Sequence, residues 1–421
     1  MPDVSFDNLL VISVVAALSP LVLGFLPRLR VPSVVVEILA GVVLGPSVLG
    51  WVEADLPVEV LALIGLAFLL FLSGLEIEAK ALRGRLLRVA LVGYLVTLAI
   101  GVPVGFGLDA AGWVSSPVLV VIALSATSLG LVVPVLKDAG KAEGTVGQTT
   151  IVAATVADFG AIVLLSLLFS TSDGSSGSRL VLFVSFVALV VVTALALGRV
   201  GMSARLGAVL EHLQDMTAEI RVRLAVVLLV AFTALAERVG LESILGAFLA
   251  GVLISVVDRD SASHPHFRTK LDAIGFGFLV PVFFVSSGVR LDLEGLVDSP
   301  SALLRVPVFL LALLVMRGVP ALLYASTMGR RPALAAGLLQ ATSLPFIVAA
   351  AQIGVEIGRI SEVTAAAMVS AGLLSVLIFP AVALSLLQRD SAPTPPAPRQ
   401  DPDAGAQEGS GLASGARSSR S

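Results

Sequence analysis

Long apolar segments separated by short polar loops run through most of the chain. Each contains few charges and is close to the roughly 20 residues that an α-helix needs to cross the hydrocarbon core of a bilayer. The thirteen segments cover residues 8–27, 33–50, 58–77, 88–108, 116–136, 145–170, 179–200, 222–238, 241–257, 271–289, 303–326, 333–355 and 361–387. This pattern predicts an all-α polytopic membrane protein with about 13 transmembrane helices.

Two of these segments are interrupted by polar residues. Residues 125–130 read Ser-Ala-Thr-Ser-Leu-Gly within the fifth segment, and residues 341–345 read Ala-Thr-Ser-Leu-Pro within the twelfth. Hydroxyl residues, Gly and Pro at membrane depth are typical of transmembrane helices that unwind where protein or a water-filled cavity surrounds them. We therefore expect two unwound helices.

The hydroxyl residues of the two interruptions are candidate cation ligands. They are Thr127, Ser128, Thr342 and Ser343. Hydroxyl oxygens and freed backbone carbonyls are hard ligands that suit Na⁺ or K⁺. The alternative is that these hydroxyls only bond back to their own helices or pack at a helix interface. Two interruptions at corresponding positions favour the binding role.

The sixth segment carries one carboxylate, Asp158, near its centre. An ionised carboxylate there costs on the order of 2.5–3.5 kcal/mol even on the gentlest scale, so it should face a water-filled cavity, a counter-charge or a bound cation. A proton and a metal ion can compete for the same two oxygens, and that competition is a mechanism for exchange. We predict that Asp158 is the metal ligand for Na⁺ or K⁺.

Three short matches indicate that the second half of the chain repeats the first. Residues 126–129 recur at 341–344 (342 − 127 = 215), residues 39–42 at 249–252 (249 − 39 = 210), and residues 73–78 resemble 287–292 (287 − 73 = 214). The matching segments are seven crossings apart, and an odd number inverts a unit. We therefore expect an inverted repeat, with repeat one at about 33–170 and repeat two at about 241–387.

The basic residues lie mainly on one side of the predicted membrane. Loops after odd-numbered segments hold seventeen Lys and Arg residues against five on the other side. This bias predicts a multi-pass plasma-membrane protein with its N-terminus outside and its C-terminus cytoplasmic. Helical spacing of apolar residues predicts a cytoplasmic linker helix at about 203–221, or an extension of the next transmembrane helix into water. Residues 388–421 lack apolar periodicity and should form a disordered cytoplasmic tail after the transmembrane domain of residues 1–387.

Composition narrows the chemistry further. Hydrophobic residues make up 57% of the 421 residues and charged residues 14%, with no cysteine and three histidines, all in polar loops. Thiolate sites and histidine relays inside the membrane are therefore excluded, and we expect no cofactor and no enzymatic activity. The expected partners are a monovalent cation, the proton and the lipid bilayer, with no nucleic acid.

Two further charged residues could serve the site. Arg317 lies in the middle of the eleventh segment and is the only basic residue so deep. It could pair with an acid, cap carbonyls freed by a broken helix, or compensate charge at an empty cation site. Glu37 lies near the cytoplasmic end of the second segment, where snorkelling or a helix-end bond is the simpler account.

Several motifs resemble the monovalent cation:proton antiporters of the Kef/NapA type, in the cation:proton antiporter-2 family. They occur in the family's order from about residue 8 to 387, and they are residues 31–33, 37–41, 44–47, 71–76, 246–251 and 281–288. The resemblance implies a panel-like dimerisation domain in a homodimer, a six-helix core with two crossed unwound helices, and elevator-type alternating access. It implies that Asp158 is the ion-binding aspartate of the family. It also implies that Arg317 occupies the family's basic position, where other members often have Lys. Family members commonly have Asp, Asn or Gln where this chain has Ala157.

The leading hypothesis is a secondary antiporter that exchanges Na⁺ or K⁺ for H⁺ and serves pH homeostasis. With Asp158 as the sole carboxylate of the core, the exchange should be electroneutral. A symporter or an anion carrier on the same fold is an alternative, as is a transport-inactive membrane scaffold or sensor, for which Ala157 is the argument.

Overall fold

The computed structural model describes residues 5–25, 31–77, 84–169, 176–201, 219–257 and 265–389, and all regular elements within these ranges are helices. Each of the thirteen expected apolar segments overlaps at least one of them. The expected linker helix at 203–221 and the tail at 388–421 lie almost entirely outside the described residues. Nine described helical stretches are long and apolar enough to cross a membrane, so the total of thirteen crossings stays a prediction.

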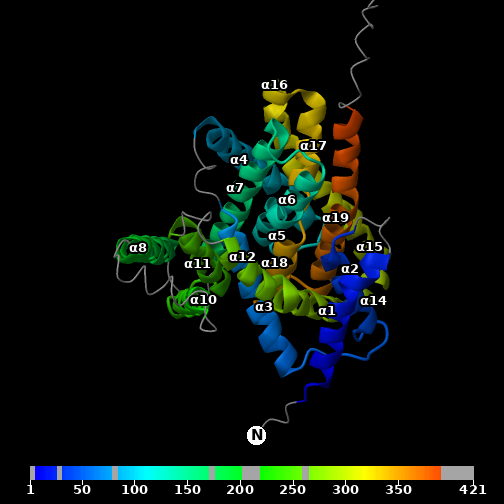
Figure 1. Ribbon diagram of the computed structural model, residues 1–421. Helices are drawn as coiled ribbons and strands as arrows, with labels where there is room; N and C mark the ends of the chain where they lie inside the picture. The colour runs from blue at the N-terminus through cyan, green and yellow to red at the C-terminus, as the bar shows by residue number, and fades with distance from the viewer. Residues whose placement is uncertain are drawn as a thin grey trace, which may run out of the picture.

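Most helix packing occurs within two bundles (Figure 1). We call the first the panel bundle, and it contains α1 (Asp7–Phe25), α2 (Ser33–Leu44), α3 (Leu56–Leu75), α10 (Ile220–Arg238), α11 (Ser243–Val257) and α12 (Pro265–Ile274), which continues through the π-helical η1 (Gly275–Leu279) into α13 (Val280–Val289). Helix α8 (Ser176–Gly201) contacts mainly α11 of this bundle.

The second, or core, bundle surrounds the two interrupted segments. It contains α4 (Gly84–Ala110), α5 (Pro117–Ser125), α6 (Leu129–Asp138), α7 (Thr145–Leu168), α15 (Pro300–Leu313), which continues through η2 (Leu314–Gly318) and η3 (Val319–Tyr324) into α16 (Ala325–Met328), and α17 (Arg330–Gln340), α18 (Pro345–Glu356) and α19 (Glu362–Arg389). The short α14 (Leu293–Val297) leads from the panel bundle into α15. Both predicted interruptions are present, between α5 and α6 and between α17 and α18. Helix α18 begins at Pro345. Proline has no backbone N–H, and the first N–H groups of a helix have no intrahelical partner, so this position loses no hydrogen bond.

One expected boundary is wrong for a local reason. The second apolar segment predicted from the sequence continues to residue 50, but α2 ends at Leu44, residue 45 is a bend and residues 46–49 form a turn. Pro46 has no backbone N–H, and its ring clashes with the preceding turn of a helix. The apolar residues after Leu44 therefore lie in a compact connection before α3.

Glycine contacts hold the panel helices close together. A Cβ at Gly41 of α2 would overlap the carbonyl oxygen of Val285 in α13, and one at Gly288 would overlap that of Ile38. Gly74 of α3 and Gly251 of α11 approach one another in the same way. These glycines belong to the motifs that match between the two halves. The first motif of the first half packs against the second motif of the second half, at Gly41 and Gly288, and the other two motifs pack together at Gly74 and Gly251. This is the packing that a pseudo-two-fold axis would produce, although the inverted repeat itself stays a prediction.

Two cavities lie between the bundles, toward opposite ends of the helices. The smaller, of about 250 Å³, is lined by the start of α2, the end of α3, and the first helix break. The larger, of about 840 Å³, is lined by the start of α3, the end of α13 and the end of α18. Near it, Gln352 of α18 donates a 2.8 Å hydrogen bond to the Ser287 hydroxyl of α13 and joins the two bundles.

The close contact at Gly288 gives the first testable prediction. Gly288→Ala should destabilise the protein by about 1–3 kcal/mol, because the methyl group would force α2 and α13 apart. Gly107→Ala is the matched control, since Gly107 also lies in a helix but has open space around its Cβ position. Thermal unfolding of the two purified variants in detergent measures the difference, and equal melting temperatures would contradict the packing account.

Candidate functional site

The site begins with the helix break between α5 and α6. Ser125 ends α5, Ala126 is extended, and α6 starts at Leu129. Backbone N–H groups at the start of a helix have no intrahelical partners, and the helix dipole adds partial positive charge there. The break therefore presents donors and positive potential inside the core bundle.

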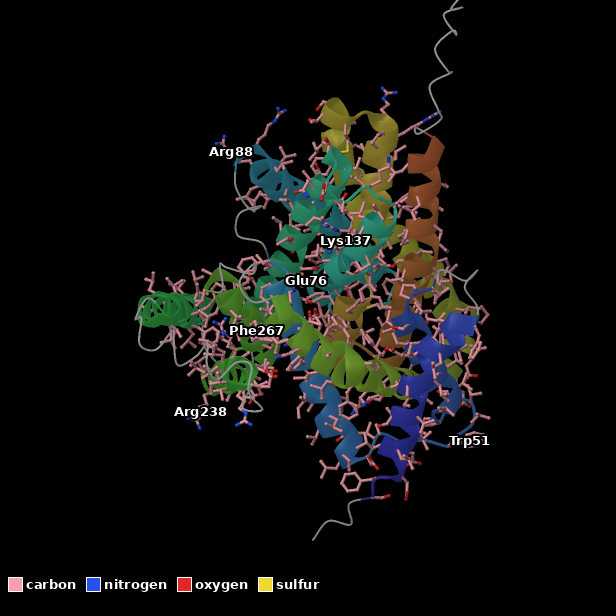
Figure 2. All side chains as sticks on the ribbon, in the orientation of Figure 1. Trp51, Glu76, Arg88, Lys137, Arg238 and Phe267 are labelled. Carbon is pink, nitrogen blue, oxygen red and sulfur yellow. The ribbon has the colours of Figure 1, made fainter. Side chains whose placement is uncertain are left out.

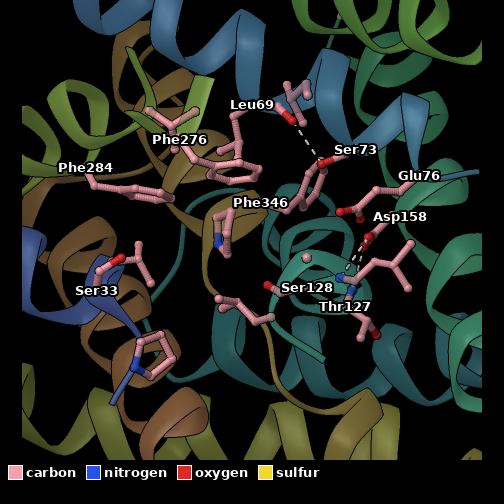
Figure 3. Close-up of a pocket in the computed structure, with 18 of the residues that line it drawn as sticks. Ser33, Leu69, Ser73, Glu76, Thr127, Ser128, Asp158, Phe276, Phe284 and Phe346 are labelled. Carbon is pink, nitrogen blue, oxygen red and sulfur yellow. Dashed lines mark hydrogen bonds between the residues drawn. The ribbon is translucent and has the colours of Figure 1, made fainter. Parts of the chain in front are cut away.

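Asp158 of α7 faces these donors. Its Oδ1 accepts a 2.9 Å hydrogen bond from the Thr127 backbone N–H, and its Oδ2 lies at the longer distance of 3.5 Å from the Leu129 nitrogen. The carboxylate thus sits at the N-terminus of α6, where an anion is favoured. Asp158 also lines the smaller cavity (Figure 3).

The two breaks cross and satisfy each other's backbone groups. The Ser128 N–H donates to the Thr342 carbonyl at 2.9 Å, and the Leu344 N–H donates to the Ser128 hydroxyl at 2.9 Å. Ser343 is tied instead to α19, because its N–H donates to Ser375 Oγ and its carbonyl accepts from the same hydroxyl. The crossing is therefore a fixed, hydrogen-bonded arrangement rather than two loose loops.

The predicted hydroxyl ligands divide into two pairs. Thr127 and Ser128 line the smaller cavity together with Asp158, whereas Thr342 and Ser343 do not. The Thr342 hydroxyl donates back to the Leu338 carbonyl of its own helix at 3.1 Å. The Ser343 hydroxyl is buried without a hydrogen-bond partner. In this conformation the second break supports the first: the cavity reaches the hydroxyl residues of the first break, and from the second side only Pro345 and Phe346 at the start of α18 line it.

Arg317, in η2, is buried at the crossing with 2% of its surface exposed. Its Nη2 and Nε donate to the Thr127 hydroxyl at 2.6 and 3.0 Å, and its Nη1 donates to Thr97 at 3.2 Å. The Thr127 hydroxyl in turn donates to the Gln340 carbonyl at 2.6 Å. Thr127 thus connects the guanidinium to both breaks, while its backbone N–H holds Asp158. No salt bridge joins Arg317 to Asp158 in the described structure.

The residue before the aspartate lies in an apolar environment. Ala157 is fully buried in a cluster with Tyr94 and Tyr324, the only two tyrosines of the chain. The Tyr94 hydroxyl lies 3.1 Å from Ser125 Oγ, at the end of α5. Aromatic packing thus occupies the space beside Asp158.

The cavity also contains two carboxylates from the panel bundle. Glu37 of α2 is buried with 4% exposure and lines the cavity wall, so it does not snorkel from a helix end. Glu76, the residue after α3, lines the same cavity and points toward Asp158 (Figure 3). Glu76, Thr97 and Gln340 were not predicted as site residues. The available signal for Thr97 and Gln340 was a single polar side chain in an otherwise apolar stretch.

Comparison with known proteins assigns this chain to a protein family. The family model described as sodium/hydrogen exchanger, transmembrane, matches residues 13–388. The chain is 30% identical to the Na⁺/H⁺-K⁺ antiporter GerN of Bacillus cereus over 276 residues, covering 64% of this chain and 68% of GerN. It is 31% identical to YjbQ of Bacillus subtilis (strain 168) over 408 residues, covering 93% of this chain and 65% of YjbQ, so it spans about two thirds of that relative's length.

A solved structure has the same fold. The sodium proton antiporter MjNhaP1 of Methanocaldococcus jannaschii superposes with a TM-score of 0.66 and 19% sequence identity, covering 91% of this chain and 98% of that one. The all-helical antiporter fold predicted from the sequence is thereby confirmed, while the Kef/NapA subtype stays a prediction. A match over most of the chain, together with these relatives, shows that this protein belongs to the sodium/hydrogen exchanger family of membrane transporters.

Proposed function

We propose that this protein is a secondary antiporter that exchanges Na⁺ for H⁺, with Asp158 carrying the two ions in turn. One observation carries the proposal: a carboxylate held by two backbone N–H groups at a helix break faces a cavity between the bundles. Hard oxygen ligands suit Na⁺, and the same oxygens accept a proton. Relatives named as Na⁺/H⁺ antiporters support sodium, and K⁺ is the second cation to test.

The lining of the cavity argues against the anion-carrier alternative. Its charged residues are Glu37, Glu76 and Asp158, and no Lys or Arg lines it. Three carboxylates repel an organic anion and attract a cation. An inactive scaffold remains as the competing hypothesis, and a transport assay separates it from an exchanger.

We further propose that the core bundle moves against the panel bundle during transport. Asp158 belongs to the core and lines the smaller cavity, while the larger cavity lies between the bundles toward the other end of the helices. A core that slides could present Asp158 to one cavity and then to the other. The homodimer implied by the resemblance, which would hold the panel still, is part of this proposal.

Removal of the Asp158 carboxylate tests the exchange. Asp158→Asn should abolish Na⁺-dependent proton movement, because an amide cannot alternate between a proton and a metal ion. Everted vesicles with a pH-sensitive dye measure the collapse of a pH gradient by Na⁺ or K⁺. Asp109→Asn, at the exposed end of α4, is the control and should behave like wild type. Wild-type rates in Asp158→Asn would end the assignment, and an inert wild-type protein would favour the scaffold.

Arg317 should act mainly by holding the crossing together. Arg317→Ala removes the bonds to Thr97 and Thr127 and should cost on the order of 3 kcal/mol of stability. Arg359→Ala, at an exposed position, should leave the melting temperature unchanged. Thermal unfolding in detergent provides the readout. Lost transport at an unchanged melting temperature would instead assign Arg317 to the transport step.

The exchange should be electroneutral, with one Na⁺ for one H⁺. Asp158 is the only carboxylate in the lining of the smaller cavity that belongs to the core bundle, since Glu37 and Glu76 belong to the panel side and would not move with it. Arg317 keeps its charge, because a guanidinium does not give up its proton in proteins. In proteoliposomes, Na⁺-driven proton movement should therefore keep the same rate when a membrane potential is imposed. A rate that follows voltage would reveal a second titrating group on the core.

A further inference from the structure

Glu76 lies against the same half-helix that holds Asp158. The space in front of Gly130, in the first turn of α6, is occupied by the Glu76 carboxylate, whose oxygens would be 3.9 and 4.0 Å from a Cβ at that position. The N-terminus of α6 therefore has Asp158 at its first N–H groups and Glu76 beside its next residue.

The Glu76 carboxylate is incompletely satisfied. Its Oε2 is buried and has no hydrogen-bond partner. Other charged side chains near it are Lys137 of α6 and both Arg268 and Asp272 of α12. In the described part of the chain neither Lys137 nor Arg268 comes within salt-bridge distance of Glu76. A buried carboxylate oxygen without a partner is costly, so this geometry calls for a proton or a cation from the cavity.

Glu76 and Asp158 belong to different bundles. Glu76 follows α3 of the panel, Asp158 lies on α7 of the core, and Figure 3 shows both side chains at one end of the cavity. In the view of Figure 2, Glu76 lies near the middle of the molecule, between the ends at which Arg88 and Trp51 are labelled. Among the described residues no three acidic or histidine side chains converge as a resident metal centre would require. The two carboxylates thus form a pair across the interface between the bundles.

We propose that Glu76 is a second ligand of the transported cation, and that it completes the site only while Asp158 faces the smaller cavity. This inference rests on the proposed exchange and on the proposed movement of the core. A cation between the two carboxylates would neutralise their repulsion and satisfy the free oxygen of Glu76. When the core moves, Asp158 leaves Glu76 behind on the panel, so the cation loses one ligand. The site then binds more weakly at the opposite face and releases its ion there.

A sided comparison of Na⁺ affinity tests this inference. Glu76→Gln should raise the Na⁺ concentration for half-maximal exchange by about tenfold or more at the membrane face that the smaller cavity opens to. The opposite face should remain within about twofold of wild type. Everted and right-side-out vesicles present the two faces, and the sequence predicts that the cavity opens to the cytoplasmic one. Glu53→Gln, an exposed carboxylate before α3, is the control and should change neither value.

The outcomes separate this inference from the proposed function. If wild-type protein exchanges Na⁺ for H⁺ but Glu76→Gln keeps wild-type affinity at both faces, Glu76 is not a ligand. An equal loss at both faces would overturn the sidedness. A wild-type protein without exchange would overturn the proposed function instead. Glu76→Asp keeps the carboxylate but shortens the side chain. It should raise the Na⁺ concentration for half-maximal exchange by an intermediate amount, again at one face only. This variant replaces Glu76→Gln if size-exclusion chromatography shows that Glu76→Gln does not fold.

Discussion

The structure depends on how two broken helices share their unpaired backbone groups. Inside a membrane an unsatisfied N–H or carbonyl is costly, so a break is stable only where partners surround it. Here each break supplies partners to the other, through Ser128, Thr342 and Leu344, and Arg317 reinforces the crossing through the Thr127 hydroxyl. The N–H groups of Thr127 and Leu129 are left for Asp158. One constraint thereby fixes both the scaffold and the ion-binding carboxylate.

The panel bundle is held together differently, by close backbone contact between its helices. Gly41 and Gly288 allow the backbones of α2 and α13 to touch, and Gly74 and Gly251 do the same for α3 and α11. Small residues at helix crossings are a common means of tight association in lipid, where burial of apolar surface provides little driving force. The panel can therefore act as a rigid surface beside the hydrogen-bonded core.

Much of this arrangement could be predicted from particular residues. The breaks were marked by hydroxyl residues, Gly130 and Pro345, because these side chains rarely interrupt apolar segments without a structural reason. Asp158 stood out as a lone acid. The cavity carboxylates were harder, because the direction of Glu76 depends on the angle between α3 and α6, which no local pattern encodes. Likewise, Thr97 meets Arg317 across 220 residues of sequence, and only the folded chain brings them together.

The central claim is that Na⁺ and H⁺ compete for one carboxylate at the crossing. The most direct test is the number of protons released when Na⁺ binds to purified protein, obtained by calorimetry in buffers of different ionisation enthalpy. At a pH low enough to protonate the site in the absence of Na⁺, the apparent binding enthalpy should change with buffer ionisation enthalpy with a slope of at least one proton per Na⁺, because Glu76 would release a second proton if it is protonated as well. Saturable Na⁺ binding with a slope of zero would show that the two ions bind independently and would contradict the account.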